Sequence, residues 1–126
     1  LANTNNTFAI YMMKLVLEWL KEQGGVSALE SQNEAKADLL YKLIDQSGFY
    51  QGTAQTEHRS TMNVTFNLAN NGLVGDFVGQ ALDQGLYALK GHRNVGGIRA
   101  SIYNAMPIAG CEALAEFMRE FERRNG

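Results

Sequence analysis

The sequence LKGHRNVGGIRASIYNAMP, residues 89–107, is the stretch from which the fold and function of this chain are most directly predicted. Apolar and polar side chains alternate through its centre, with Ile98 and Ala100 on one face and Arg99 on the other. An alternation with period two is typical of a half-buried strand, so we expect a strand over 98–103. The central stretch therefore predicts sheet structure.

The segment before this strand combines glycines with positive charge. Between Asp83 and Glu112 there is no carboxylate. The basic side chains in that interval are Lys90, His92, Arg93 and Arg99. An arginine fork matches a carboxylate or phosphate, and the glycines of the expected loop 91–97 let backbone approach a ligand closely. The residues alone leave two alternatives open, an anion site for a small acidic molecule and a solvated basic loop in a hairpin.

Outward from this stretch, hydrophobic periodicity predicts the remaining elements. We expect helices over 7–23, 27–47, 72–84 and 107–124, and further strands over 62–68 and 86–90. Ser27 and Glu30 have the spacing of a capping box at the start of the second helix. Strand 62–68, helix 72–84 and strand 86–90 have the order of a split βαβ unit. The fold class is therefore expected to be α+β, a small antiparallel or mixed sheet with helices packed on one face.

Composition limits the classes of function. A chain of 126 residues is one domain's worth, and its formal net charge of -2 gives no overall basic field for nucleic acid. Lys14, Glu18 and Lys21 interrupt the longest apolar stretches, so no membrane span is expected. The single cysteine, Cys111, excludes an internal disulfide, fits a cytoplasmic protein and is expected in the core.

The other polar residues give weaker signals. His58-Arg59 is expected to be a surface or strand-edge pair. His92 has no second histidine, cysteine or acid at ligand spacing, so no metal site is expected. No nucleophile–base pair can be assembled from local spacing, and the residues alone support binding rather than catalysis.

Several segments, in order along essentially the whole chain, carry a family resemblance. Residues 89–107 resemble the C-terminal signature of phosphoserine aminotransferases, a pyridoxal-phosphate-dependent family of class V aminotransferases. Asn3-Thr4 with Thr7–Tyr11 resembles the segment that leads into the long interdomain helix of that family. The match continues at Glu18–Lys21, Gly24-Gly25, Arg59-Ser60, Met62–Val64, Phe117-Met118 and Glu120-Phe121.

The resemblance implies an aspartate-aminotransferase-like fold. Residues 1–24 would be the interdomain loop and helix, and residues 25–126 the C-terminal small domain. The large domain, with the lysine that bonds the cofactor, would lie upstream, so the chain alone is expected to be inactive. The parent reaction would transfer an amino group from L-glutamate to 3-phosphohydroxypyruvate, giving O-phospho-L-serine, and vitamin B6 synthesis is a second possible pathway. A cytoplasmic homodimer is implied, with no nucleic acid or membrane partner.

The resemblance also implies roles for particular residues. Arg99 matches the arginine that grips the substrate α-carboxylate, and His92 and Arg93 match the pair that meets its distal anion. Asn3 and Thr4 match residues that bind the pyridoxal phosphate of the neighbouring subunit through its phosphate group. Where the family usually has two prolines after this pair, the chain has Asn5 and Asn6.

Two other functional classes remain open on the residues alone. One is a stand-alone domain that binds small acidic metabolites through the Lys90–Arg99 segment. The other is an interaction module whose first helix docks to a partner through the apolar stripe from Phe8 to Trp19.

Overall fold

The computed structural model describes residues 4–126 of the chain. These residues divide into two compact units, Leu1–Gln32 and Asn33–Gly126, with the boundary inside the second helix. The expected division into an interdomain segment and a small domain at residues 24 and 25 stays a prediction.

The first unit contains helix α1, Thr7–Glu22, and the start of helix α2, Val26–Gln46. Asn6 caps α1, because its side-chain oxygen accepts a hydrogen bond from the Ala9 N–H at 3.0 Å. Gly24 and Gly25 then turn the chain with φ values of 95° and 85°, a region that favours glycine.

The capping box predicted at Ser27 and Glu30 is wrong. Helix α2 begins at Val26, so Ser27 already lies inside the first turn. Its carbonyl oxygen accepts a hydrogen bond from the Ser31 hydroxyl at 3.2 Å. The reason is the compactness of the glycine turn, since the Gly25 carbonyl already accepts the Leu29 N–H and leaves no loop residue for a capping side chain.

Helix α1 is apolar around most of its circumference, and none of its residues is buried. Phe8 is 72% exposed and Met13 65% exposed. The other exposed large apolar side chains on α1 are Ile10, Tyr11, Met12, Leu15, Val16 and Leu17. A helix of this kind is typical of one that other protein surface covers, because a helix on a protein surface needs only one apolar stripe.

The second unit is built on a three-stranded sheet. Its strands are β1, Tyr50–Gly52, β2, Asn63–Leu68, and β3, Ile98–Ser101, in the order β1-β2-β3 with both pairs antiparallel. Along β2 the burial alternates as predicted, because Val64, Phe66 and Leu68 are buried while the residues between them are partly exposed. The sheet therefore has one apolar face and one polar face.

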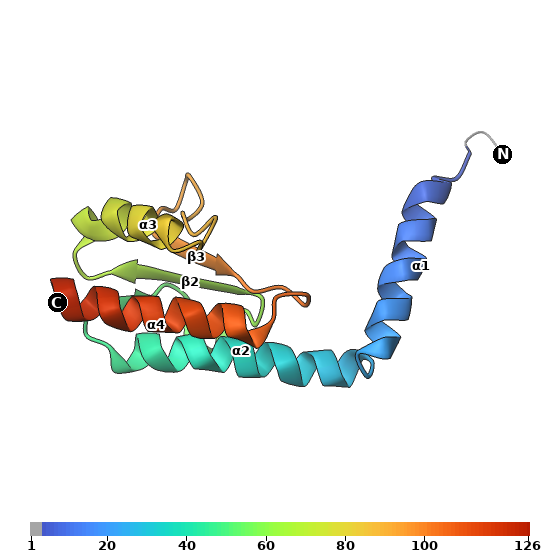
Figure 1. The fold of residues 1–126 in the computed structure, drawn as a ribbon, viewed down its shortest axis with the longest axis horizontal. Helices are drawn as coiled ribbons and strands as arrows, with labels where there is room; N and C mark the ends of the chain where they lie inside the picture. The colour runs from blue at the N-terminus through green and yellow to red at the C-terminus, as the bar shows by residue number, and fades with distance from the viewer. Residues whose placement is uncertain (1–3) are drawn as a thin grey trace. The chain divides into compact units, whose positions relative to one another are not determined.

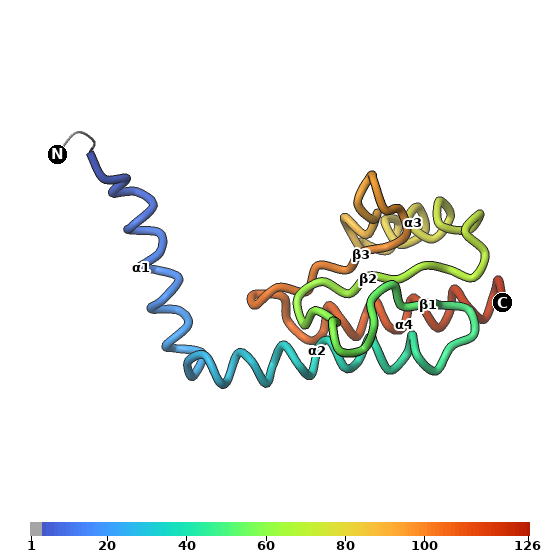
Figure 2. The backbone as a smooth tube through the Cα atoms, turned by 180° about the vertical axis from the view of Figure 1, so that it is seen from behind, coloured from blue at the N-terminus to red at the C-terminus, as the bar shows by residue number. Residues whose placement is uncertain are grey.

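Helices cover the apolar face. Helix α3, Val74–Asp83, and helix α4, Ile108–Asn125, meet there with α2, and α2 and α4 run alongside each other in the two views of Figures 1 and 2. The Phe77 ring of α3 lies 4.9 Å from that of Phe117 on α4 and 6.0 Å from that of Phe66 on β2, measured between centroids. These contacts confirm the α+β class with helices on one face. Short 3₁₀ turns occupy Thr56–His58 and Asn71–Leu73.

The strand predicted over 86–90 is wrong. Ala88 has a φ of 60°, a left-handed conformation that an extended strand cannot contain. Leu86 lies just after α3 and takes part in its C-terminal cap, because its N–H donates to the Ala81 carbonyl at 2.9 Å. Only a single antiparallel bridge, from Lys90 to Ile98, joins this segment to the sheet. The predicted split βαβ unit is therefore also wrong, and the sheet of the described residues is purely antiparallel.

Candidate functional site

The predicted substrate-binding residues lie on one hairpin, which we call the 89–99 hairpin. Its two arms are joined where the Gly91 N–H donates to the Gly97 carbonyl at 2.9 Å and the Arg99 N–H donates to the Leu89 carbonyl at 2.8 Å. Its second arm continues into β3, the edge strand of the sheet. The hairpin therefore fixes the loop 91–97 at the end of a sheet strand.

Two glycines are required where the hairpin packs tightly. Gly97 has a φ of 67°, and a Cβ at this position would overlap the side-chain oxygen of Asn67 on β2. A Cβ at Gly91 would overlap the main-chain carbonyl of Gly96 across the loop. Gly91 and Gly97 therefore serve close packing of backbone against backbone and against β2.

Arg99 lies on the polar face of the sheet, in register with Thr65 of β2. The residue is partly exposed, its Nε is buried without a hydrogen-bond partner, and its guanidinium makes no salt bridge within residues 4–126. An unpaired buried donor on a cation costs free energy, and an anion that accepts from it would recover that cost. The Nε of Arg59 is also buried without a partner, but the Arg59 guanidinium is paired with Asp45, so Arg99 is the better prepared of the two to bind a carboxylate.

His92 and Arg93 are exposed on the loop of the same hairpin. The His92 carbonyl accepts the N–H groups of Val95 and Gly96 at 2.9 and 2.8 Å, which closes the loop into a tight turn. The His92 Nδ1 accepts the Asn94 N–H at 3.3 Å, so a neutral ring carries its proton on Nε2. His92 and Arg93 are thus two further hydrogen-bond donors on the same 89–99 hairpin as Arg99.

The residues expected to meet the cofactor phosphate lie before α1. Asn3 falls outside the described residues. Thr4 is exposed and precedes the α1 N-cap, Asn6, by two positions. The start of a helix presents N–H groups to anions, but the Ala9 N–H is already bonded to Asn6.

Arg59, in contrast to Arg99, is already neutralised. Its two terminal nitrogens donate to the two carboxylate oxygens of Asp45 at 2.6 Å each, and its guanidinium stacks 4.5 Å over the Tyr41 ring. The Arg59 guanidinium lowers the pKa of Asp45. His58 is exposed at the end of the 3₁₀ turn. This pair is a structural feature of the surface rather than a second anion site.

Sequence reasoning missed a buried cation, Lys36 of α2. Its side chain is almost completely buried, and its Nζ donates to the carbonyls of Ile102, Tyr103 and Met106 at 3.1, 2.8 and 3.1 Å. Burial is the main cause that lowers the Lys36 pKa. A signal was present, because Lys36 falls on the apolar stripe of α2 at helical spacing from Leu40.

Cys111 is buried at the start of α4, as predicted. Burial raises the pKa of its thiol, which opposes formation of a nucleophilic thiolate. Among residues 4–126, no group of three or more histidine, cysteine, aspartate or glutamate side chains could hold a metal ion.

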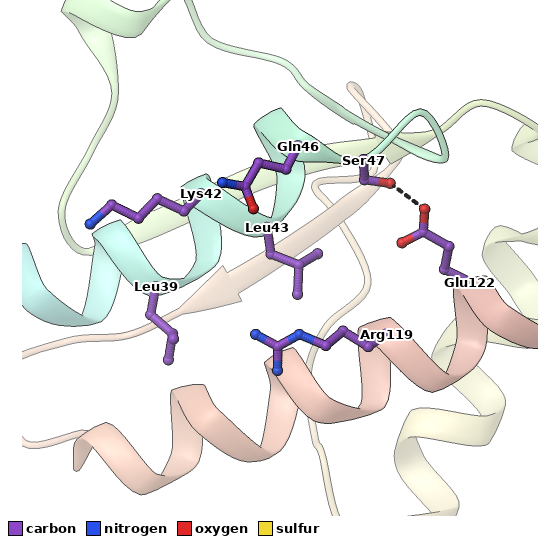
Figure 3. A pocket seen from close by; sticks show the side chains of 7 residues that line it. All are labelled: Leu39, Lys42, Leu43, Gln46, Ser47, Arg119 and Glu122. Atoms are coloured by element: carbon purple, nitrogen blue, oxygen red, sulfur yellow. Dashed lines mark hydrogen bonds between the residues drawn. The ribbon is translucent and has the colours of Figure 1, made fainter.

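Two hollows in the second unit lie away from the predicted anion residues. A groove of about 390 Å³ runs between α2 and α4, where the Ser47 hydroxyl donates to Glu122 at 2.8 Å (Figure 3). The groove is lined by Leu39, Lys42, Leu43, Gln46, Ser47, Arg119 and Glu122. A more apolar pocket of about 380 Å³ lies beside β3, and we call it the outer-edge pocket. Arg99, His92 and Arg93 line neither hollow.

The structure gives one negative result on membranes. Within the described part of the chain, no helix is both long enough and apolar enough to cross a membrane.

Comparison with known proteins identifies the family. The profile of the class-V aminotransferases matches residues 2–114. Over 125 residues the chain is 58% identical to the phosphoserine aminotransferase of Geobacillus kaustophilus, covering 98% of this chain and 35% of that protein. It is 56% identical over 126 residues to the phosphoserine aminotransferase of Bacillus subtilis, covering 99% of this chain and 35% of that protein.

Solved structures agree with the sequences. Phosphoserine aminotransferase from Bacillus circulans subsp. alkalophilus superposes with a TM-score of 0.93 at 50% identity, over 98% of this chain and 35% of that one. The pyridoxal-phosphate-bound phosphoserine aminotransferase from Trichomonas vaginalis gives a TM-score of 0.85 at 36% identity, over 93% and 34%. The chain thus has the fold of part of these enzymes and spans about a third of their length. On this sequence and structural evidence, the chain belongs to the class-V aminotransferases.

Proposed function

We propose that the chain is the C-terminal small domain, residues 25–126, of a phosphoserine aminotransferase, preceded by its interdomain loop and helix, residues 1–24. The observation that carries the proposal is Arg99, a partly exposed residue whose guanidinium Nε is buried and has no hydrogen-bond partner. The similarity to phosphoserine aminotransferases over nearly the whole chain supports the reaction class. A large domain outside residues 1–126 would supply the cofactor lysine.

The reaction is amino transfer from L-glutamate to 3-phosphohydroxypyruvate, which yields O-phospho-L-serine and 2-oxoglutarate and serves serine biosynthesis. Both substrates carry two anionic groups, a carboxylate at the reacting end and a second anion at the far end. The 89–99 hairpin offers cations suited to both. Arg99 binds the α-carboxylate through its planar fork, and His92 with Arg93 binds the phosphate or the glutamate side-chain carboxylate.

Pyridoxal phosphate supplies the electron sink of such a reaction when it is bound. The described residues fit only a part of its site. Lys36 has its ammonium committed to three carbonyls, so it is not available to bond the cofactor. Thr4, exposed before α1, is suited to contact the cofactor phosphate, with Asn3 as its partner in the proposal. This chain alone is therefore expected to orient substrate but not to transaminate.

The proposal extends to assembly and location. Asn3 and Thr4 would serve the cofactor of a neighbouring subunit, which makes the enzyme a homodimer with shared active sites. The buried free thiol of Cys111 suits the reducing cytoplasm. Use of the phosphorylated substrate of vitamin B6 synthesis is part of the same proposal, because that substrate also has a carboxylate and a phosphate.

The stand-alone binding domain has no support in the comparisons. The relatives named above are about three times as long as this chain, and all are aminotransferases. Within residues 4–126, Arg99 lines neither of the two hollows described above, so they give no support to a stand-alone binding domain.

The test is transamination by the intact gene product, with O-phospho-L-serine and 2-oxoglutarate as substrates. Arg99→Ala is expected to lower kcat/KM by about 100-fold or more, because a charge-assisted bidentate contact is lost. Arg99→Lys should recover little of it, since an ammonium cannot form the fork. The matched control is Arg123→Ala, which removes an exposed arginine on α4 that pairs with Glu120.

Three outcomes are informative. Loss of activity in both Arg99 variants but not in the control supports the reaction and the residue. Full activity in Arg99→Ala discards the carboxylate role. An intact protein without this transaminase activity overturns the proposed function.

A further inference from the structure

The pairing of β3 with β2 determines which side chain lies nearest to Arg99 (Figure 1). The Arg99 N–H donates to the Leu89 carbonyl, so the main-chain groups of Arg99 point away from β2. Arg99 and Thr65 are therefore a non-hydrogen-bonded pair, the kind of antiparallel pair in which the side chains come closest. The Cβ atoms of such a pair are about 4.5–5.5 Å apart on the same face. Thr65 is thus the residue of β2 next to the Arg99 side chain.

The neighbours of Arg99 within the 89–99 hairpin and β3 offer little to pack against. The residues two positions away along β3 are Gly97, which has no side chain, and Ser101, whose side chain is short. Leu89, across the hairpin, packs in the apolar core and lines the outer-edge pocket. Packing on the polar face must therefore come mainly from β2.

The other polar side chains of β2 are directed to residues other than Arg99. The Asn63 side-chain oxygen lies 3.3 Å from the Ser101 hydroxyl, its partner across the two strands. The Asn67 side-chain oxygen lies against Gly97, where a Cβ would overlap it. Thr65 is the one residue of this row in β2 that is left to face Arg99.

The Thr65 hydroxyl is occupied on the side away from β3. Thr53, which follows β1, lies beside it, because the Thr53 N–H donates to the Thr65 carbonyl at 3.3 Å. The hydroxyl oxygens of the two threonines lie 2.5 Å apart. A β-branched side chain has few rotamers, and this bond selects among them. Thr65 therefore presents hydrocarbon, and not its hydroxyl, to Arg99.

The state of the Arg99 Nε agrees with a hydrocarbon neighbour. The atom is buried and has no hydrogen-bond partner, although the residue as a whole is partly exposed. A hydroxyl directed at it would accept its N–H, whereas a hydrocarbon group excludes water and accepts nothing. Burial at Nε also restricts the rotamers of the long arginine side chain, which costs conformational entropy before any ligand binds.

We propose that Thr65 is a positioning residue for Arg99. The hydrocarbon of its side chain, oriented by Thr53, packs against the Arg99 stem and holds the guanidinium ready for the substrate carboxylate. The inference rests on the proposed function, in which Arg99 binds that carboxylate. Its benefit is that the substrate meets an arginine already ordered, so less of the binding free energy is lost in fixing the side chain.

The first experiment measures proton exchange with water at the Arg99 Nε–H by nuclear magnetic resonance of the 126-residue chain. Thr65→Ala is expected to speed this exchange by at least about fivefold, because water gains access to the atom. Thr65→Val keeps a branched hydrocarbon side chain and should keep the rate within about twofold of wild type. An unchanged rate in Thr65→Ala overturns the inference.

Two controls separate local packing from a general loss of stability. The Arg59 Nε is also buried without a partner, so its N–H is a reference in the same spectra. Asn63→Ala shortens a side chain on the same face of β2 whose direct partner is Ser101, and should leave Arg99 exchange within about twofold. Equal acceleration at Arg59 and Arg99 in Thr65→Ala, or equal acceleration of Arg99 in Asn63→Ala, shows a loosened fold and overturns the inference.

The second experiment is a double-mutant cycle on transamination by the intact enzyme. Thr65→Ala should lower kcat/KM by about 5- to 20-fold, less than Arg99→Ala does, and Thr65→Val should restore most of it. In the Arg99→Ala background, Thr65→Ala should have no further effect beyond about twofold, because it acts only through Arg99. If the two losses multiply, Thr65 acts independently of Arg99 and the positioning role is wrong.

The failures of the two proposals can be told apart, because the exchange measurement requires no reaction. An intact protein without transaminase activity overturns the proposed function and removes the carboxylate as the ligand of Arg99. The exchange rates still decide whether Thr65 holds the stem. An active enzyme in which Thr65→Ala speeds exchange at Arg99 but leaves kcat/KM unchanged overturns only the positioning role.

Discussion

Lys36→Met is expected to be the most destabilising exchange of a charged residue in the second unit. The side chain is 2% exposed, and its ammonium is the donor to three carbonyls at the turn between β3 and α4. Methionine refills the volume of the stem but donates nothing, so three acceptors lose a charged partner. At about 1–1.5 kcal/mol for each lost hydrogen bond, the free energy of unfolding should fall by about 3–4.5 kcal/mol.

Thermal or urea unfolding followed by far-UV circular dichroism measures this loss. For a unit of this size, 1 kcal/mol shifts Tm by about 4–8 °C, so the expected change is a fall of about 12–36 °C. The control is Lys42→Met on the same helix. Lys42 is exposed and pairs with Asp38 at 3.1 Å, and such pairs contribute about 0.5 kcal/mol. If Lys36→Met unfolds within about 1 kcal/mol of Lys42→Met, the three carbonyls do not depend on the ammonium and the reasoning is refuted.

Three further predictions concern the aromatic core, two glycines and the ion pair. Phe77→Ala should cost about 3–5 kcal/mol in urea unfolding, because the ring is fully buried among other rings, and a cost under about 1 kcal/mol would contradict that packing. Gly97→Ala should destabilise the hairpin by more than about 1 kcal/mol, whereas Gly75→Ala, which has open space inside α3, should stabilise the protein by up to about 1 kcal/mol. If both substitutions shift the melting temperature in the same direction, close packing at Gly97 is contradicted. Because Arg59 lowers the pKa of Asp45, their pair stabilises the fold above the ordinary carboxyl pKa, and this stability is lost as pH falls through the lowered pKa of the folded state. The urea midpoints of wild type and Asp45→Asn should therefore converge in acid. A difference that stays constant with pH would show that the ion pair does not cause it.

The sequence was sufficient for elements whose pattern is dictated by burial on one face. Strand β2 alternates in the sequence because it alternates in the sheet, and the prediction over 62–68 differs from the structure by one residue. The segment 86–90 failed because its apolar content does not reveal backbone conformation. An alanine at position 88 does not predict a φ of 60°, because alanine seldom adopts this conformation and tertiary packing must impose it.

For the candidate site, residue types indicated the chemistry but not the state of each charge. Arg59 and Arg99 look alike in the sequence, yet Arg59 is paired with Asp45 and Arg99 makes no salt bridge among the described residues. That difference depends on contacts between residues far apart in the chain, which periodicity does not report. The roles of Arg99, His92 and Arg93 in substrate binding, and of Thr4 at the cofactor, stay predictions.

The distribution of aromatic residues has a spectroscopic consequence. The only tryptophan of the chain, Trp19, lies on α1, while the core of the second unit is built from phenylalanine and tyrosine rings such as Tyr50 and Phe66. Tryptophan fluorescence, excited at the red edge of the tryptophan absorption band where tyrosine does not absorb, therefore reports on the surroundings of α1 alone. Four of the five tyrosines lie in the second unit, so the tyrosine contribution to near-ultraviolet dichroism reports chiefly on that unit. One sample can thus show separately when other protein surface covers α1 and when the core of the second unit unfolds, without any introduced label.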